Sequence, residues 1–121
     1  MSEVVMGSLY DLNKSALASA KGINPLKAIQ SQDKALTNFF ASGKYFMLLC
    51  NELRDYTVFC LKTDNKIQNA KEELKVCIKN RGELLGLDPT EDGIAFEIWM
   101  RVDGKIYAYY LFPYDAAIIE C

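Results

Sequence analysis

Two apolar, aromatic-rich runs flank the dipeptide Asp103-Gly104 between Ile94 and Tyr114. An Asp-Gly pair favours positive φ at both positions, and the resulting mirror-image turn matches the right-handed twist of two paired strands. A two-residue turn also fixes the register, because the residues on either side of it must then pair. The sequence therefore predicts a β-hairpin in which Val102 faces Lys105.

This register sorts the side chains of the hairpin into two faces, because successive residues of a strand point to opposite sides. One face is apolar and is expected to be buried; it holds Phe96, Ile98, Met100, Tyr107, Tyr109 and Leu111. The other face mixes charges with large rings and is expected to be partly wet and partly covered; it holds Ala95, Glu97, Trp99, Arg101, Ile106, Ala108, Tyr110 and Phe112. A slip of one residue would bury Arg101 and Glu97, which disfavours other registers.

Apolar residues recur at helical spacing in three segments that precede the hairpin. The first predicted helix begins at Ser8 and is stopped by Gly22, and the second begins at Asn24-Pro25 and ends at Gly43. The third begins at Thr63 or Asp64 and ends at Gly82. Asp33 interrupts the apolar stripe of the second helix, which leaves open either one continuous helix or a helix broken near Ser31.

Short apolar segments predict further strands at Lys44–Cys50, Tyr56–Lys62 and Glu83–Leu87. Pro113 must end or bulge the second hairpin strand, and Ala116–Glu120 is expected to form a last short strand or an extended tail. The predicted fold class is α+β, in the order α-α-β-β-α-β-β-β. It has a mainly antiparallel sheet of about five strands and three helices, which gather mainly on one face. No linker or repeat divides the chain, so residues 1–121 are predicted to form a single globular domain.

Composition excludes several kinds of catalyst. The chain has 121 residues, of which 50% are hydrophobic and 25% are charged, and this balance is ordinary for a globular protein. It contains no histidine, which is the usual general base near neutral pH and the group that activates serine or cysteine nucleophiles. Ser-His-Asp and Cys-His arrangements are therefore excluded, and we predict a protein that is not an enzyme and uses no cofactor.

The four cysteines, Cys50, Cys60, Cys77 and Cys121, form no Cys-x-x-Cys pair. Reduced, buried thiols are therefore expected, and neither a disulfide framework nor a metal site is predicted. The longest apolar run, Tyr45–Cys50, is far shorter than the ~20 residues of a membrane-spanning helix. The N-terminus also lacks a basic segment before an apolar stretch, so we expect a cytoplasmic protein with no membrane partner.

Charge is distributed unevenly. Residues 1–82 contain twelve basic and eight acidic side chains, whereas residues 83–121 contain two basic and eight acidic ones. On the third predicted helix, Lys71, Lys75 and Lys79 recur at four-residue spacing and either contact nucleic-acid phosphates or form a solvated helix face. The acidic residues of the last third either imitate phosphates or serve in turns; they are Asp88, Glu91, Asp92, Asp103, Asp115 and Glu120.

The aromatic residues of the hairpin are the candidate contact surface. Trp and Tyr are enriched at the centres of protein interfaces, because they bury a large area and keep a polar group. The predicted interface residues are Trp99, Arg101, Tyr110, Phe112 and Tyr114. The alternative is that such rings fill the core, which is the expectation for Phe96, Tyr107 and Tyr109 on the apolar face.

Three segments carry a resemblance to known proteins: Ser8-Leu9-Tyr10-Asp11-Leu12-Asn13-Lys14, Lys44-Tyr45-Phe46-Met47-Leu48-Leu49-Cys50 and Leu111-Phe112-Pro113-Tyr114-Asp115. In these segments the chain resembles small, histidine-poor accessory proteins of phages and plasmids of Gram-positive bacteria, including anti-defence proteins of the anti-CRISPR type. Members of that group share no common fold or catalytic signature, so no functional residue carries over. The resemblance implies a stoichiometric binder that blocks a host protein or a nucleoprotein complex.

The sequence thus favours a non-catalytic protein-binding module, an inhibitor or accessory protein of a mobile genetic element. Two alternatives stay open. One is a nucleic-acid-binding accessory protein that uses the row of lysines, and the other is a small nucleotide-binding or hydrolytic protein with a closed pocket. Pairing of two hairpin faces in a homodimer is a further option.

Overall fold

The structure is a computed structural model that describes residues 16–115, apart from residues 51, 54, 64 and 65 and the side chains of residues 55–59. Its elements are α2 (Pro25–Ser31), α3 (Asp33–Ala41), β1 (Tyr45–Cys50), β2 (Asp55–Lys62), α4 (Ile67–Arg81), β3 (Glu83–Pro89), β4 (Phe96–Val102) and β5 (Lys105–Pro113). Residues 16–19 are also helical, but residues 20–22 are not, so the first predicted helix ends earlier than Gly22. Its part before residue 16 and the last predicted strand lie outside the described residues. The α+β class and the order of the elements are confirmed.

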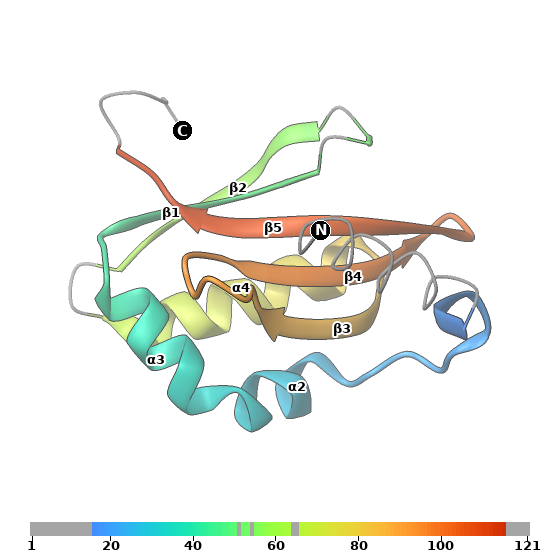
Figure 1. The fold of residues 1–121 in the computed structure, drawn as a ribbon, viewed down its shortest axis with the longest axis horizontal. Helices are drawn as coiled ribbons and strands as arrows, with labels where there is room; N and C mark the ends of the chain where they lie inside the picture. Colours follow the sequence, from blue (N-terminus) through green and yellow to red (C-terminus); the bar gives the residue numbers. More distant parts are fainter. Residues whose placement is uncertain (1–15, 51, 54, 64–65, 116–121) are drawn as a thin grey trace.

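The strands form one antiparallel sheet in the order β2-β1-β5-β4-β3 (Figure 1). The central strand, β5, pairs with β4 in the predicted register, from Val102 opposite Lys105 to Phe96 opposite Leu111. The turn between them holds Asp103 at φ 53° and Gly104 at φ 79°. An Asp-Gly turn with positive φ at both positions therefore sets the register, as the sequence predicts.

The segment predicted as the second helix consists of two helices. The Asn24 side chain caps α2 by accepting hydrogen bonds from the backbone N–H groups of Leu26 (2.9 Å) and Lys27 (3.3 Å). Gln32 then leaves the helical conformation, with φ −105° and ψ 19°, and α3 begins at Asp33. Of the two alternatives, the helix broken near Ser31 is confirmed, and the break increases the number of helices beyond the three that were expected.

Helices α2, α3 and α4 lie on one face of the sheet (Figure 1), and the core fills the space between them and the strands. The predicted apolar face of the hairpin supplies one side of this core. The largest fully buried side chains are Tyr109, Phe40, Phe46, Phe96, Leu36, Leu48, Leu61, Leu74, Ile78, Leu84, Ile98 and Met100. Burial of each stabilises the fold by about 1.5–3 kcal/mol before entropy is counted.

The opposite face of the sheet, named the outer face below, is more covered than the sequence predicts. Met47 on β1, Glu97 on β4 and Ile106 on β5 are each less than one tenth exposed. Glu97 is the unexpected member, because the predicted register placed it on a face that was expected to be only partly covered.

Two backbone carbonyls on the β3 edge of the sheet have hydrogen-bond partners outside the sheet. On β3, the carbonyl of Leu84 accepts a hydrogen bond from the backbone N–H of Ile23 at 2.8 Å. The carbonyl of Leu87 accepts one from Nε2 of Gln32 at 3.2 Å. Edge strands whose polar groups are covered in this way resist pairing with another chain.

The cysteines do not all behave as expected. Cys50 and Cys77 are not disulfide-bonded, and Cys50 is buried in the core. Cys60 is disulfide-bonded, so the expectation of reduced thiols is wrong at this position. That expectation used spacing along the chain, which does not report which cysteines the fold brings together.

Candidate functional site

The predicted interface residues Trp99 and Tyr110 meet around a third residue, Glu97, on the outer face. Glu97 and Tyr110 are direct cross-strand partners on β4 and β5, and Trp99 is two residues further along β4 on the same side. Nε1 of Trp99 donates a hydrogen bond of 2.8 Å to Oε1 of Glu97. We refer to these three residues as the outer-face cluster.

The members of the outer-face cluster differ in exposure. Glu97 is 6% exposed, whereas Tyr110 is 37% exposed and is the large hydrophobic residue that the hairpin strands present to solvent. Burial raises the pKa of Tyr110 to about 12, and the charge of Glu97 and a hydrogen bond with it act in the same direction. The tyrosine hydroxyl therefore stays protonated and remains a donor beside the carboxyl group.

Arg101, a third predicted interface residue, is already engaged within the chain. Its Nη1 donates a hydrogen bond to Glu83, with which it forms an ion pair. Its Nη2 lies within 2.7–3.0 Å of three carbonyl oxygens, those of Leu17, Ala18 and Ala20. Leu17 and Ala18 belong to the helical residues 16–19 and Ala20 follows them, so Arg101 satisfies carbonyls at the end of that helix and ties it to the sheet.

Phe112 and Tyr114 lie towards the other end of the outer face. Phe112 pairs with Met47 across β5 and β1, and the Tyr114 ring lies 5.8 Å from the ring of Tyr45. Both are half-buried. Sequence reasoning missed Tyr45 and Met47 as parts of this surface, although the uninterrupted apolar run of β1 already indicated a strand with two covered faces.

The lysine row on α4 is not a uniform basic surface. Nζ of Lys71 lies 2.6 Å from Oδ1 of Asp33 and 2.8 Å from Oγ1 of Thr37, and the Lys71 side chain is 9% exposed. Nζ of Lys75 lies 3.2 Å from a carboxylate oxygen of Glu72. A solvated face is therefore the wrong description of Lys71, because Asp33 on α3 draws its ammonium group into the contact between the helices. Lys79 is exposed.

The acidic residues of the last third are mainly turn residues where the structure describes them. The Asp92 carboxylate accepts hydrogen bonds from Oγ1 of Thr90 (2.6 Å) and from the backbone N–H of Ile94 (3.0 Å). These bonds, the Thr90 bond first, hold the pKa of Asp92 below its usual value. Asp103 sits in the hairpin turn, and Asp88 accepts a hydrogen bond from Gln32. Glu120 lies outside the described residues.

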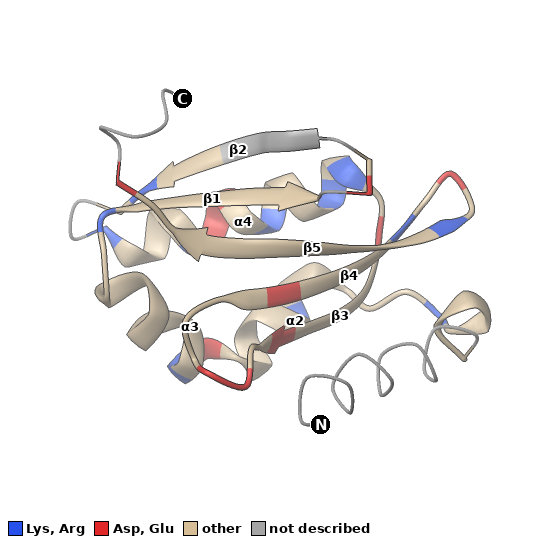
Figure 2. Ribbon diagram, turned by 45° about the horizontal axis from the view of Figure 1, so that its top comes forward, with Lys and Arg blue, Asp and Glu red and all other residues tan. Residues whose placement is uncertain are grey.

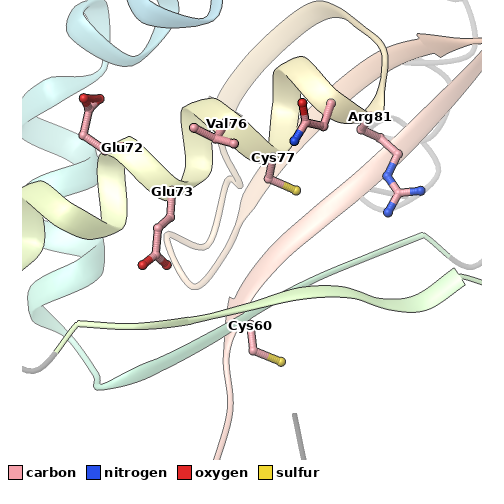
Figure 3. A pocket seen from close by; sticks show the side chains of 7 residues that line it. Cys60, Glu72, Glu73, Val76, Cys77 and Arg81 are labelled. Atoms are coloured by element: carbon pink, nitrogen blue, oxygen red, sulfur yellow. The ribbon is translucent and has the colours of Figure 1, made fainter.

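A surface groove of about 690 Å³ lies between α4 and β2 (Figure 3). Its described lining consists of Cys60, Glu72, Glu73, Val76, Cys77, Asn80 and Arg81. Val76 is 51% exposed, and the Arg81 guanidinium lies 5.9 Å from the centre of the Tyr109 ring. The nucleotide-binding or hydrolytic alternative requires a closed pocket with tyrosines and carboxylates, and the described lining supplies the carboxylates without a tyrosine.

Among the described residues, no three carboxylate or thiol side chains gather closely enough to hold a metal ion. In the part of the chain that the structure covers, no helix has the length and apolar character needed to span a bilayer.

Comparison with known proteins finds no matching family model, no matching curated protein and no matching solved structure. The resemblance to anti-defence proteins therefore stays a prediction, and the function has to be argued from the geometry.

Proposed function

We propose that this chain is a non-catalytic protein-binding module, which contacts its partner through the outer face of the sheet. One observation carries the proposal: the central strand presents the exposed ring of Tyr110 beside Trp99, on the face opposite α2, α3 and α4. The partner is a host protein or nucleoprotein complex, and the chain acts on it as an inhibitor or accessory protein in the cytoplasm.

The proposal rests on the small loss of conformational entropy that this surface would undergo on binding. Tyr110 and Trp99 lie on paired strands in the middle of the sheet, so their backbones are already fixed before a partner arrives. Aromatic side chains have few rotatable bonds and a large area, which makes them frequent hot spots at interfaces. Complete burial of the exposed part of such a ring contributes on the order of 1 kcal/mol or more.

Binding also fits the chemistry that the chain lacks. Without histidine, the usual proton-transfer group near neutral pH is missing, whereas a protein that acts by occupying a surface needs none. Nucleic-acid binding through the lysine row gains no support from the structure, because Lys71 and Lys75 each have a carboxylate partner.

The test compares two single substitutions of exposed apolar residues on opposite faces. Tyr110→Ala removes the outer-face ring, and Val76→Ala removes a comparably exposed side chain on α4. Arg101 is unsuitable for this test, because its substitution would also release the helix end that it holds. Both variants are first checked for folding by circular dichroism.

Each protein is then immobilised and incubated with host lysate, and retained proteins are quantified by mass spectrometry; the affinity of the retained partner is measured with purified components. We expect Tyr110→Ala to weaken that affinity by ~30-fold, equivalent to about 2 kcal/mol, and Val76→Ala to leave it unchanged. Equal affinities for both folded variants would show that the outer face is not the contact surface. Sedimentation at several concentrations separates a homodimer from a complex with a different protein.

A further inference from the structure

Glu97 is a buried acidic side chain without a cationic partner among the described residues. The ion pairs of the described part join Lys71 with Asp33, Lys75 with Glu72 and Arg101 with Glu83, and none includes Glu97. Its hydrogen-bond donor is the Trp99 indole. Because a carboxylate has about four acceptor positions, one neutral donor leaves most of its capacity unused.

A buried carboxylate in this state is unusual energetically. Removing a charge from water is costly unless an opposite charge or a full set of hydrogen bonds compensates, and buried acidic residues are normally paired. The nearest basic residue on the same strand, Arg101, is held by Glu83 and by three backbone carbonyls. Within the described part of the chain, the basic side chain of β4 is therefore already engaged and is not paired with Glu97.

The surroundings of Glu97 suit a cation from outside the chain. Trp99 and Tyr110 place two electron-rich rings next to the carboxyl group, and cations are attracted to the faces of such rings. Acidic positions also lie on β3 and β4 and in the loop between them (Figure 2), and residues 83–121 contain eight acidic and two basic side chains. This end of the molecule attracts positively charged surfaces over distances of about a Debye length.

We infer that Glu97 is the binding site for an arginine side chain of the partner protein, which enters beside the exposed ring of Tyr110. This inference rests on the proposed function, since it names the chemistry of the partner that the outer face contacts. Arginine fits better than lysine, because its planar guanidinium stacks on aromatic rings, loses less hydration and donates two parallel hydrogen bonds to a carboxylate. The partner thus presents an arginine surrounded by side chains that can cover Trp99 and Tyr110.

The single tryptophan of the chain gives a direct readout, because its indole N–H is the group that donates to Glu97. The full-length protein is labelled with ¹⁵N, and the indole N–H resonance is followed during titration with N-acetyl-arginine amide. The neutral isostere N-acetyl-citrulline amide is titrated in parallel. We expect a saturable shift with the arginine probe and none with the citrulline probe.

Two substitutions distinguish a specific pair from a diffuse acidic field. Glu97→Gln is expected to weaken binding of the arginine probe at least tenfold. Asp88→Asn removes the same charge from the exposed residue that pairs with Glu97 across β3 and β4, and is expected to change the binding less than threefold. If Glu97→Gln does not fold, the comparison of arginine and citrulline on the unaltered protein decides the question.

The inference is overturned if the indole resonance responds equally to both probes or to neither, or if Asp88→Asn weakens binding as much as Glu97→Gln. The proposed function is judged separately, by partner affinity. If Tyr110→Ala loses partner affinity but the protein shows no specific response to arginine, the partner contacts the outer face without an arginine at Glu97. A specific arginine response with full partner affinity in Tyr110→Ala would show that the partner binds elsewhere.

Discussion

The ion pair between Lys71 and Asp33 is expected to be strongly asymmetric. It joins α4 to α3, and its two side chains differ in exposure: 9% for Lys71 and 63% for Asp33. Removing the acid leaves an ammonium group in a nearly buried position with only the Thr37 hydroxyl as a described partner. Removing the base leaves a carboxylate that water can reach.

Two limiting cases, a fully buried and a fully exposed ion pair, bracket the expected change in the free energy of unfolding. Breaking a fully buried pair by removing one partner costs about 3–5 kcal/mol, whereas an exposed pair contributes about 0.2–1 kcal/mol. Because water reaches Asp33, we expect Asp33→Ala to reduce the free energy of unfolding by about 1–2 kcal/mol. Lys71→Met keeps the apolar stem and removes the buried charge. It should therefore change the free energy of unfolding by less than about 1 kcal/mol in either direction.

Urea unfolding followed by far-ultraviolet circular dichroism measures both changes, and the fluorescence of Trp99 reports whether unfolding is a single transition. Asp33→Asn is the matched control, since it removes the charge but keeps the size and one hydrogen-bond acceptor. Its cost should fall between those of the other two variants. If Lys71→Met proves more destabilising than Asp33→Ala, the asymmetry of burial does not govern this pair and the reasoning is refuted.

Two further predictions concern the backbone of β3 and the outer face. A Cβ atom on Gly82 would lie 2.6 Å from the carbonyl oxygen of Arg101, so Gly82→Ala should lower the free energy of unfolding by about 1–3 kcal/mol, measured by thermal unfolding. A Cβ atom on Gly86 would have its closest contact at 3.8 Å, so Gly86→Ala should cost less than half as much. Equal costs would contradict the steric argument. The raised pKa of Tyr110, about 12, means that the folded protein keeps a proton that the unfolded chain releases near pH 10, so stability is lost as the pH rises from about 10 to 12. Tyr110→Phe should flatten this loss in urea unfolding between pH 9 and 12, and an unchanged pH dependence would show that other groups cause it.

The parts of the fold that could be predicted are those that local chemistry decides. The hairpin register follows from an Asp-Gly turn and from period-two alternation, which are both properties of adjacent residues. The alternative of a break between α2 and α3 follows from Asp33 in an apolar stripe. Each of these signals lies within a few residues of the feature that it determines.

The parts that could not be predicted depend on contacts between distant segments. Lys71 has the spacing of a solvated helix face, and only the approach of α3 reveals why it is buried. Arg101 was predicted to contact a partner, yet its donors meet carbonyls more than eighty residues away in the sequence. Glu97 was interpreted as a sign of a wet face, because no sequence pattern indicates that a buried carboxyl group will accept a hydrogen bond from a tryptophan two residues away.

The helix break at Gln32 has a consequence for how copies of this chain can associate. The Gln32 backbone keeps its hydrogen bonds to Ala28 and Leu36 but leaves helical dihedral angles, and its side chain donates to the carbonyl of Leu87. Together with the Ile23 amide, this contact occupies two carbonyls of β3 that a strand of a neighbouring molecule would otherwise need. Growth of a fibril from that side of the sheet is thereby disfavoured.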